Sequence, residues 1–114
     1  MITMDALKAF GANTDEGLKR CMGKESFYLM LVGSALNCDQ INKLIDQIKS
    51  ENYGDAFETA HALKGIYANL SLTPLSEIVS PITEHLRANE VIDYIPLTDE
   101  LLARMKKLME LAGM

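Results

Sequence analysis

The fold is decided by residues 55–86, DAFETAHALKGIYANLSLTPLSEIVSPITEHL, which contain two helix patterns separated by one short break. In the first pattern, apolar residues recur at the three- and four-residue spacing of a helix with one buried face; they are Ala56, Ala60, Leu63, Tyr67 and Leu70. The second pattern begins at Thr73-Pro74, because proline favours the first helical position. Its apolar stripe consists of Leu75, Ile78, Val79, Ile82 and Leu86. Two amphipathic helices with so short a connection are expected to pack antiparallel.

The same periodicity continues on both sides of this stretch. Upstream, Asp39 is the expected N-cap of a helix over residues 40–51, and Asp55 that of the helix ending near Leu70. Downstream, Asp93 to Pro96 is an expected loop, and Thr98 begins a last helix. Four long amphipathic helices joined by short breaks predict an all-α fold, an antiparallel four-helix bundle.

The N-terminal third contains shorter helix patterns. Residues 4–10 and a stretch from Thr14 or Asp15 to Gly23 predict two short helices that would cover one end of the bundle. Residues 26–37 are apolar nearly all round, which predicts a central buried helix. We therefore expect a single domain over residues 1–114, with a short N-terminal helix in residues 1–14 and the bundle core in residues 15–114.

Composition narrows the classes of function. The chain has 114 residues and a net charge of −5, and it has no basic patch, so nucleic acid and anionic membranes are not expected partners. The start of the chain lacks a signal-peptide pattern, and the longest apolar stretch is too short to span a bilayer. Cys21 and Cys38 form no CxxC motif and are expected to be reduced thiols. We expect a cytoplasmic protein, complete as given, with no cofactor and no metal.

His61 is the residue whose surroundings suggest chemistry. On a helix with 100° per residue, it points roughly 150° away from the centre of the apolar face, so it is predicted to be exposed. Gly65 costs about 1 kcal/mol relative to alanine inside a helix. Because helical side chains lean toward the N-terminus, a side chain at 65 would cover His61. Glycine there, with Ala62 and Ala68 nearby, leaves the imidazole open to a large partner.

Lys64 adds a positive charge on the same side of the helix, three residues after His61. A flexible ammonium there could pair with an anion held on the imidazole, for example a phosphoryl group. Neutral imidazole is a good nucleophile. From these residues alone, an exposed nucleophile with an open approach and an incidental surface histidine are both open interpretations.

The stretch His61-Ala62-Leu63-Lys64-Gly65 resembles the HxLKG motif of histidine-containing phosphotransfer (HPt) domains. Further similarities lie at Asn69 and Leu70 near the end of the motif helix, and at Leu75 and Ile82 in the next one. Upstream, residues 17–23 resemble the short turn before the family's first bundle helix, and residues 27–31 resemble that helix. The resemblance covers about residues 15 to 112.

The resemblance implies a phosphocarrier in a two-component phosphorelay. His61 would accept a phosphoryl group from the aspartate of a response-regulator receiver domain and pass it to another receiver. Lys64 would stabilise the phosphoryl charge and Gly65 would give clearance, with the metal ion held by the partner. A hybrid sensor histidine kinase is a further candidate partner. As a transfer intermediate the protein would have no catalytic activity of its own, and no Gly-rich phosphate loop or Walker motif suggests that it binds ATP.

Four residues in or near the motif are predicted to contact the partner: Phe57, Glu58, Ala62 and Ala68. Phe57 lies at the edge of the core face, so a boundary core residue is the alternative interpretation for it. The sequence departs from the family at Ser71, where glycine is usual, and the turn there is expected to be reshaped. A polar residue reaching the phosphoryl site from the next helix would be Thr83 or Glu84. His85 lacks Lys and Gly companions and is interpreted as a surface residue.

Three alternatives compete with the phosphocarrier. One is an adaptor of the same fold that docks response regulators without carrying phosphate. Another is a histidine phosphatase or metal hydrolase, which would need further ligands or arginines, and no arginine or second histidine shares the strip of His61. The last is a kinase dimerisation helix pair, which usually has an acidic residue directly after the histidine, where this chain has Ala62.

Overall fold

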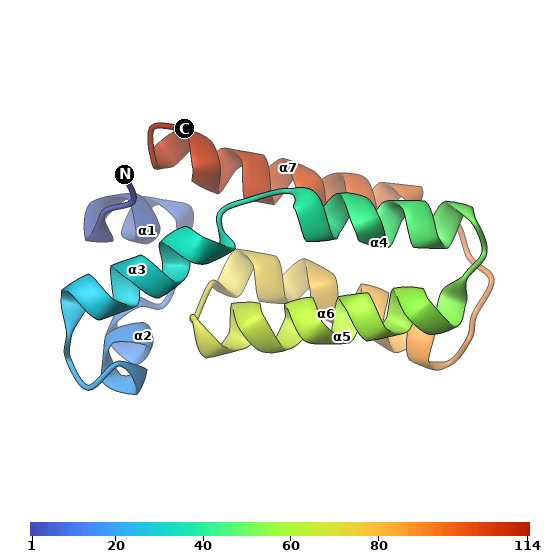
Figure 1. The fold of residues 1–114 in the computed structure, drawn as a ribbon, viewed down its shortest axis with the longest axis horizontal. Coiled ribbons are helices and arrows are strands. Elements are labelled where there is room, and N and C mark those ends of the chain that lie inside the picture. Colours follow the sequence, from blue (N-terminus) through green and yellow to red (C-terminus); the bar gives the residue numbers. More distant parts are fainter.

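The computed structural model describes residues 1–114 and consists of seven helices without a strand, which confirms the all-α prediction. In chain order the helices are α1 (Met4–Phe10), α2 (Thr14–Arg20), α3 (Glu25–Ala35), α4 (Asp39–Lys49), α5 (Tyr53–Asn69), α6 (Thr73–Arg87) and α7 (Ile95–Leu111). They form two groups, a bundle of four helices and a cluster of three at one end of it (Figure 1).

Helices α4 to α7 form the predicted antiparallel four-helix bundle (Figure 1). Helix α5 packs against α4 and α6, and α7 packs against α6 and α4, so that each helix has two neighbours in the bundle. The inward faces meet in a core whose fully buried side chains include Ile41, Leu44, Leu75, Ile82, Leu101, Met105 and Leu108. The apolar stripes read from the sequence therefore point to one common interior.

Helices α1 to α3 lie at the end of the bundle where α5 turns into α6 (Figure 1). Helix α1 packs against α7, and the amino group of Met1 donates a hydrogen bond of 2.8 Å to the carbonyl oxygen of Ala112. The expectation of short helices that cover one end of the bundle is confirmed for α1 and α2.

Helix α3 is not the central buried helix that its apolar sequence predicted. Only Tyr28 and Val32 of this helix are buried, whereas Met30 is 61% exposed and Phe27 is also exposed. The reason is its position: α3 lies at the end of the bundle, outside the interior that α4 to α7 enclose (Figure 1). The first helix of the bundle is therefore α4, and not the segment at residues 27–31.

Two long helices begin earlier than predicted. Helix α5 begins at Tyr53, because Asn52 is its N-cap and also donates a hydrogen bond of 2.7 Å to Asp55, the predicted cap. Helix α7 begins at Ile95, and Thr98 lies buried inside its first turn, where its hydroxyl donates to the carbonyl oxygen of Tyr94 at 3.2 Å. Differences of two or three residues at helix ends leave the packing of the bundle unchanged.

The turn between α5 and α6 is closed by Ser71, which has a left-handed backbone with φ of 56°. The amide of Ser71 donates to the carbonyl oxygen of Ala68, and the amide of Leu72 donates to that of Tyr67 at 2.9 Å. This is the hydrogen-bond pattern with which helices commonly end, and it favours glycine at the position of Ser71. The turn thus keeps the usual geometry with a residue that tolerates it less well.

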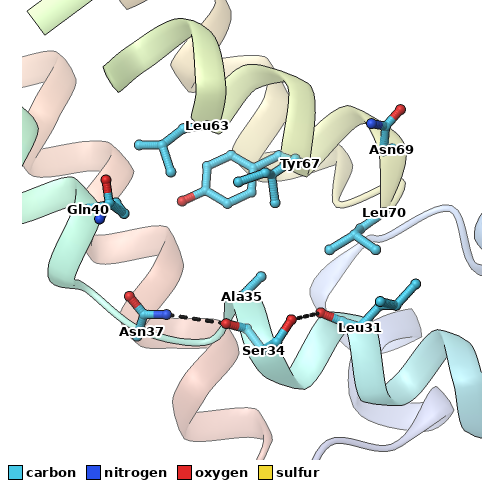
Figure 2. A pocket seen from close by; sticks show the side chains of 10 residues that line it. Leu31, Ser34, Ala35, Asn37, Gln40, Leu63, Tyr67, Asn69 and Leu70 are labelled. Carbon is cyan, nitrogen blue, oxygen red and sulfur yellow. Dashed lines mark hydrogen bonds between the residues drawn. The ribbon is translucent and has the colours of Figure 1, made fainter. Parts of the chain in front are cut away.

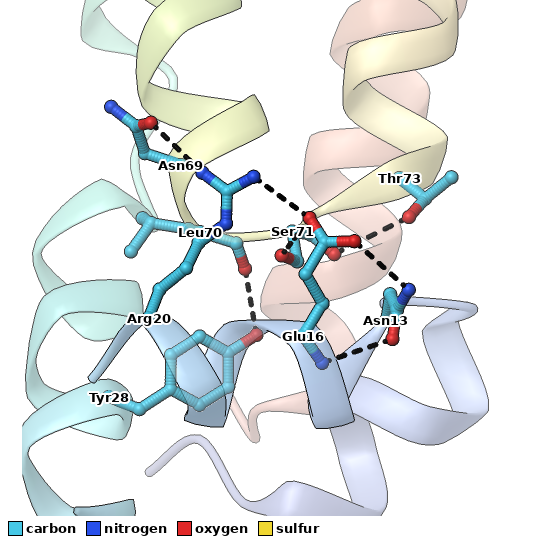
Figure 3. Close-up of polar contacts among 8 residues, drawn as sticks. All are labelled: Asn13, Glu16, Arg20, Tyr28, Asn69, Leu70, Ser71 and Thr73. Atoms are coloured by element: carbon cyan, nitrogen blue, oxygen red, sulfur yellow. Dashed lines mark hydrogen bonds and ion pairs between the residues drawn. The ribbon is translucent and has the colours of Figure 1, made fainter. Parts of the chain in front are cut away.

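Hydrogen bonds from α2 and α3 hold this turn in place (Figure 3). The hydroxyl of Tyr28 donates to the carbonyl oxygen of Leu70 at 2.7 Å. The hydroxyl of Ser71 donates to the carboxylate of Glu16 at 3.2 Å, and its carbonyl accepts from the amide of Asn13 at 2.9 Å. The cluster of short helices is therefore anchored to the C-terminal end of α5.

Candidate functional site

His61 lies in the middle of α5, on the exposed face of the helix. The opposite face carries Ala60, Leu63 and Tyr67, all buried in the core. The exposure that helical periodicity predicted for His61 is confirmed. A 17-residue helix with its apolar side fixed in the bundle thus presents the imidazole to solvent on a rigid support.

The His61 ring stacks on Phe57, which in turn contacts a cation. The ring of Phe57, one turn earlier, stacks on the imidazole with centroids 5.6 Å apart and an interplanar angle of 18°. The guanidinium of Arg87, from α6, lies 4.9 Å from the centroid of the same Phe57 ring. Stacking of this kind stabilises the arrangement by a modest amount and restricts the rotation of the imidazole. Phe57 is half-buried, so its own chain uses much of the side chain that was predicted for a partner.

Glu84 joins Lys64 of α5 to Arg87 of α6. Its carboxylate accepts a hydrogen bond from Lys64 Nζ at 3.3 Å through one oxygen and from Arg87 Nε at 3.1 Å through the other. These hydrogen bonds, first that of Lys64 and then that of Arg87, lower the pKa of the Glu84 carboxyl. The carboxylate is therefore ionised at neutral pH, and it bridges α5 and α6 at the surface.

Of the two polar candidates on α6, only Glu84 lies at this surface. Thr83 is completely buried, and its hydroxyl donates to the carbonyl oxygen of Val79 within the same helix at 2.8 Å. This common backbone contact satisfies a threonine inside a helix. Thr83 therefore faces the core, and Glu84 is the α6 residue that contacts the site.

The surface around His61 is open on the side of Gly65. A Cβ atom added at Gly65 would meet no atom within 4 Å, so nothing in the fold requires glycine there. The predicted partner contacts Glu58, Ala62 and Ala68 are exposed. Three of the four positions next to His61 on this strip therefore have a hydrogen atom or a methyl group as their side chain, which leaves the imidazole accessible.

A groove lies between α3 and α5, beside this strip (Figure 2). It has a volume of about 380 Å³ and is lined by Leu31, Ser34, Ala35, Asn37, Gln40, Leu63, Ile66, Tyr67, Asn69 and Leu70. Ile66 is 43% exposed at its edge. Sequence reasoning missed this groove because it placed α3 among the bundle helices, where no such gap would exist.

Arg87 was also missed from the sequence. The strip of His61 on α5 contains no arginine, as expected, but α6 supplies one from the side. The available signal was the pair Glu84 and Arg87, three residues apart on one helix face. Which face of α6 meets α5 depends on how the two helices pack, and the spacing within α6 does not show this.

His85, the second histidine of the chain, has different surroundings. It is half-exposed, and its Nδ1 lies 3.3 Å from the carboxylate of Glu90, beyond the end of α6. No group of three histidine, cysteine or acidic side chains comes together in a way that could hold a metal ion. No helix combines the length and the apolar character that a membrane span requires.

Comparison with known proteins places the chain in a family. No curated protein and no solved structure matched it. The model of the Hpt domain family matches residues 35–112, which begin in the last turn of α3 and include all four bundle helices. The match begins later than residue 15, where the sequence resemblance was placed, so α1, α2 and most of α3 lie outside it. The chain belongs to the Hpt domain family, whose members are phosphocarrier modules with a phosphotransfer role in two-component signalling.

Proposed function

We propose that the protein is a relay intermediate, which accepts a phosphoryl group on His61 from the aspartate of one receiver domain and passes it to another. The observation that carries the proposal is the exposed imidazole of His61, the first residue of the HALKG stretch on α5, within the segment that matches the family. The chain offers a nucleophile, a cation and an open approach.

The proposed transfer is a single in-line displacement. The unprotonated imidazole nitrogen of His61 attacks phosphorus, and an N–P bond forms as the O–P bond of the aspartyl phosphate breaks. The electron pair of that bond goes to the leaving carboxylate, and the other ring nitrogen of His61 keeps its proton. Transfer to the second receiver is the same displacement in reverse. The receiver would supply the metal ion that neutralises the phosphoryl oxygens.

Residues around His61 would support this step in different ways. Lys64 would pair with the phosphoryl oxygens, because a charge-assisted hydrogen bond is stronger than a neutral one. Phe57 would hold the ring plane through the stack described above. Gly65 would leave room for the receiver's aspartate to approach, since no side chain of this protein fills that space.

The receiver would dock on the exposed strip of α5. Ala62 and Ala68 would allow close contact, and Glu58 would lie at the rim of the interface. The groove between α3 and α5 lies beside the strip and would accept an apolar side chain of the partner. A hybrid sensor histidine kinase would present its receiver domain to the same surface.

The test is phosphotransfer from a panel of phosphorylated receiver domains to the full chain, with acid-labile phosphate as the readout. Because the chain has only two histidines, His61→Gln and His85→Gln are matched variants. We expect label on the parent protein and on His85→Gln, and none on His61→Gln. Docking without label would favour the adaptor alternative, and label on His61→Gln would move the acceptor away from His61.

A further inference from the structure

A single carboxylate, that of Glu84, pairs with both Lys64 and Arg87. Glu84 accepts from Lys64 at 3.3 Å and from Arg87 at 3.1 Å, and no other acidic side chain pairs with either of them. The three side chains come from two helices, so the arrangement depends on the packing of α5 against α6. Lys64, the cation closest in sequence to His61, is thus already paired before any phosphate arrives.

A phosphoryl group on His61 would be a second anion within reach of the same lysine. Lys64 and His61 are three residues apart on one helix face, and the lysine stem is flexible. The Glu84 carboxylate and a phosphoryl group would then compete for one ammonium group. They would also repel each other, because like charges at this range are unfavourable even near the surface.

Arg87 keeps the Glu84 carboxylate close to Lys64. Its guanidinium lies over the Phe57 ring while its Nε donates to the second oxygen of Glu84. When Lys64 turns toward a phosphoryl group, Glu84 is still held by Arg87. The carboxylate therefore stays beside the site and does not swing away into solvent.

Building on the proposed function, we infer that Glu84 is a positioning residue: it competes with the phosphoryl group for Lys64 and weakens the hold of the protein on its phosphate. A relay intermediate has to release its phosphoryl group as readily as it takes it. The Glu84 carboxylate shifts the exchange equilibrium toward release.

The experiment measures that equilibrium directly. The full chain is loaded with phosphoramidate, a small phosphoryl donor that needs no protein partner, and mixed with a receiver that exchanges phosphate with it. The readout is the ratio of phosphohistidine to aspartyl phosphate at equilibrium. The variants are Glu84→Gln, Glu84→Asp, Lys64→Ala and the double variant of Glu84→Gln with Lys64→Ala.

Glu77→Gln is the matched control, because it makes the same change two turns earlier on α6, where Glu77 lies 3.7 Å from Arg104. We expect Glu84→Gln to raise the ratio about twofold to fivefold, the range that exposed ion pairs reach. Glu84→Asp keeps the carboxylate and should stay near the parent value, and Glu77→Gln should not change it. In the Lys64→Ala background the effect of Glu84→Gln should shrink.

Two results would overturn the inference. One is a ratio for Glu84→Gln that equals or falls below that of the parent protein. The other is a full effect of Glu84→Gln in the absence of Lys64, which would make it a general charge effect. Failure of the proposed function has a different signature: the parent protein would take up no phosphate or exchange it with no receiver, and the role of Glu84 would fall with it.

Discussion

Gly17 and Gly65 are both helical glycines, but the two regions around them use glycine for opposite reasons. Gly17, in α2, is buried, and a Cβ atom there would collide with the ring of Tyr28. Gly65, in α5, is exposed, and a Cβ atom there would meet nothing within 4 Å. The fold itself requires glycine at the first position and not at the second.

The side chains around Gly17 make contacts inside the molecule, whereas those around Gly65 face solvent. Near Gly17 they are engaged inside the molecule: the hydroxyl of Tyr28 donates to the carbonyl oxygen of Leu70 and thereby fixes the end of α5. Near Gly65 the surface consists of small exposed side chains and one imidazole. A helical glycine that costs stability without any internal contact indicates space that is used from outside the molecule.

The same substitution at the two positions should change stability in opposite directions. Gly17→Ala overpacks the contact with Tyr28 and should lower the free energy of unfolding by about 1–3 kcal/mol. Gly65→Ala adds a better helix former in open space and should raise it by about 0.5–1 kcal/mol. Denaturant unfolding followed by circular dichroism measures both. Equal changes in the free energy of unfolding at the two positions would contradict the distinction between a glycine that the fold requires and one that it does not.

A larger side chain at Gly65 should separate function from stability. Gly65→Leu should leave the bundle at least as stable as the parent protein, since leucine is a better helix former than glycine and meets no atom of the fold at its Cβ. It should slow phosphotransfer to His61 by about tenfold or more, because a misplaced reacting group costs rate steeply. The measurement is a time course of phosphotransfer from a phosphorylated receiver, with samples quenched at set intervals. The control is Gly54→Leu, which changes another exposed helical glycine with open space around it. Unchanged rates in Gly65→Leu would refute the clearance argument.

The smallest expected effect concerns the titration of Glu84. Its pKa is lowered from the ordinary value of 4.5, mainly by the hydrogen bond from Lys64. A lowered pKa in the folded state means that the carboxylate contact is present above the unfolded pKa and is lost as pH falls through the folded one. NMR titration of the Glu84 carboxyl should therefore give a midpoint below 4.5, which moves upward in Lys64→Ala. A midpoint that is the same in Lys64→Ala as in the parent protein would contradict the contact between Glu84 and Lys64.

Much of the bundle could be predicted because each helix carries its burial pattern in its own sequence. The stripes of α5 and α6 give both the existence of the helices and their inward faces. The same argument places His61 outward and Lys64 beside it. These are properties of single helices, and the spacing of residues along one chain segment contains them.

Features that depend on how helices meet could not be predicted in the same way. The apolar sequence of α3 indicates contact with other elements but not where the helix lies, so it was placed inside the bundle. The contacts of Glu84 with Lys64 and of Arg87 with Phe57 depend on the packing of α6 against α5. The left-handed backbone of Ser71 follows from the turn that closes α5 and not from a preference of serine.

The central claim, that His61 is the phosphoacceptor, is tested most directly without any partner protein. The parent chain, His61→Gln and His85→Gln are treated with phosphoramidate, the excess reagent is removed, and phosphorus NMR counts the N–P resonances of the protein. The account predicts one resonance in the parent protein, the same resonance in His85→Gln and none in His61→Gln. An N–P resonance that persists in His61→Gln and disappears in His85→Gln would contradict the account.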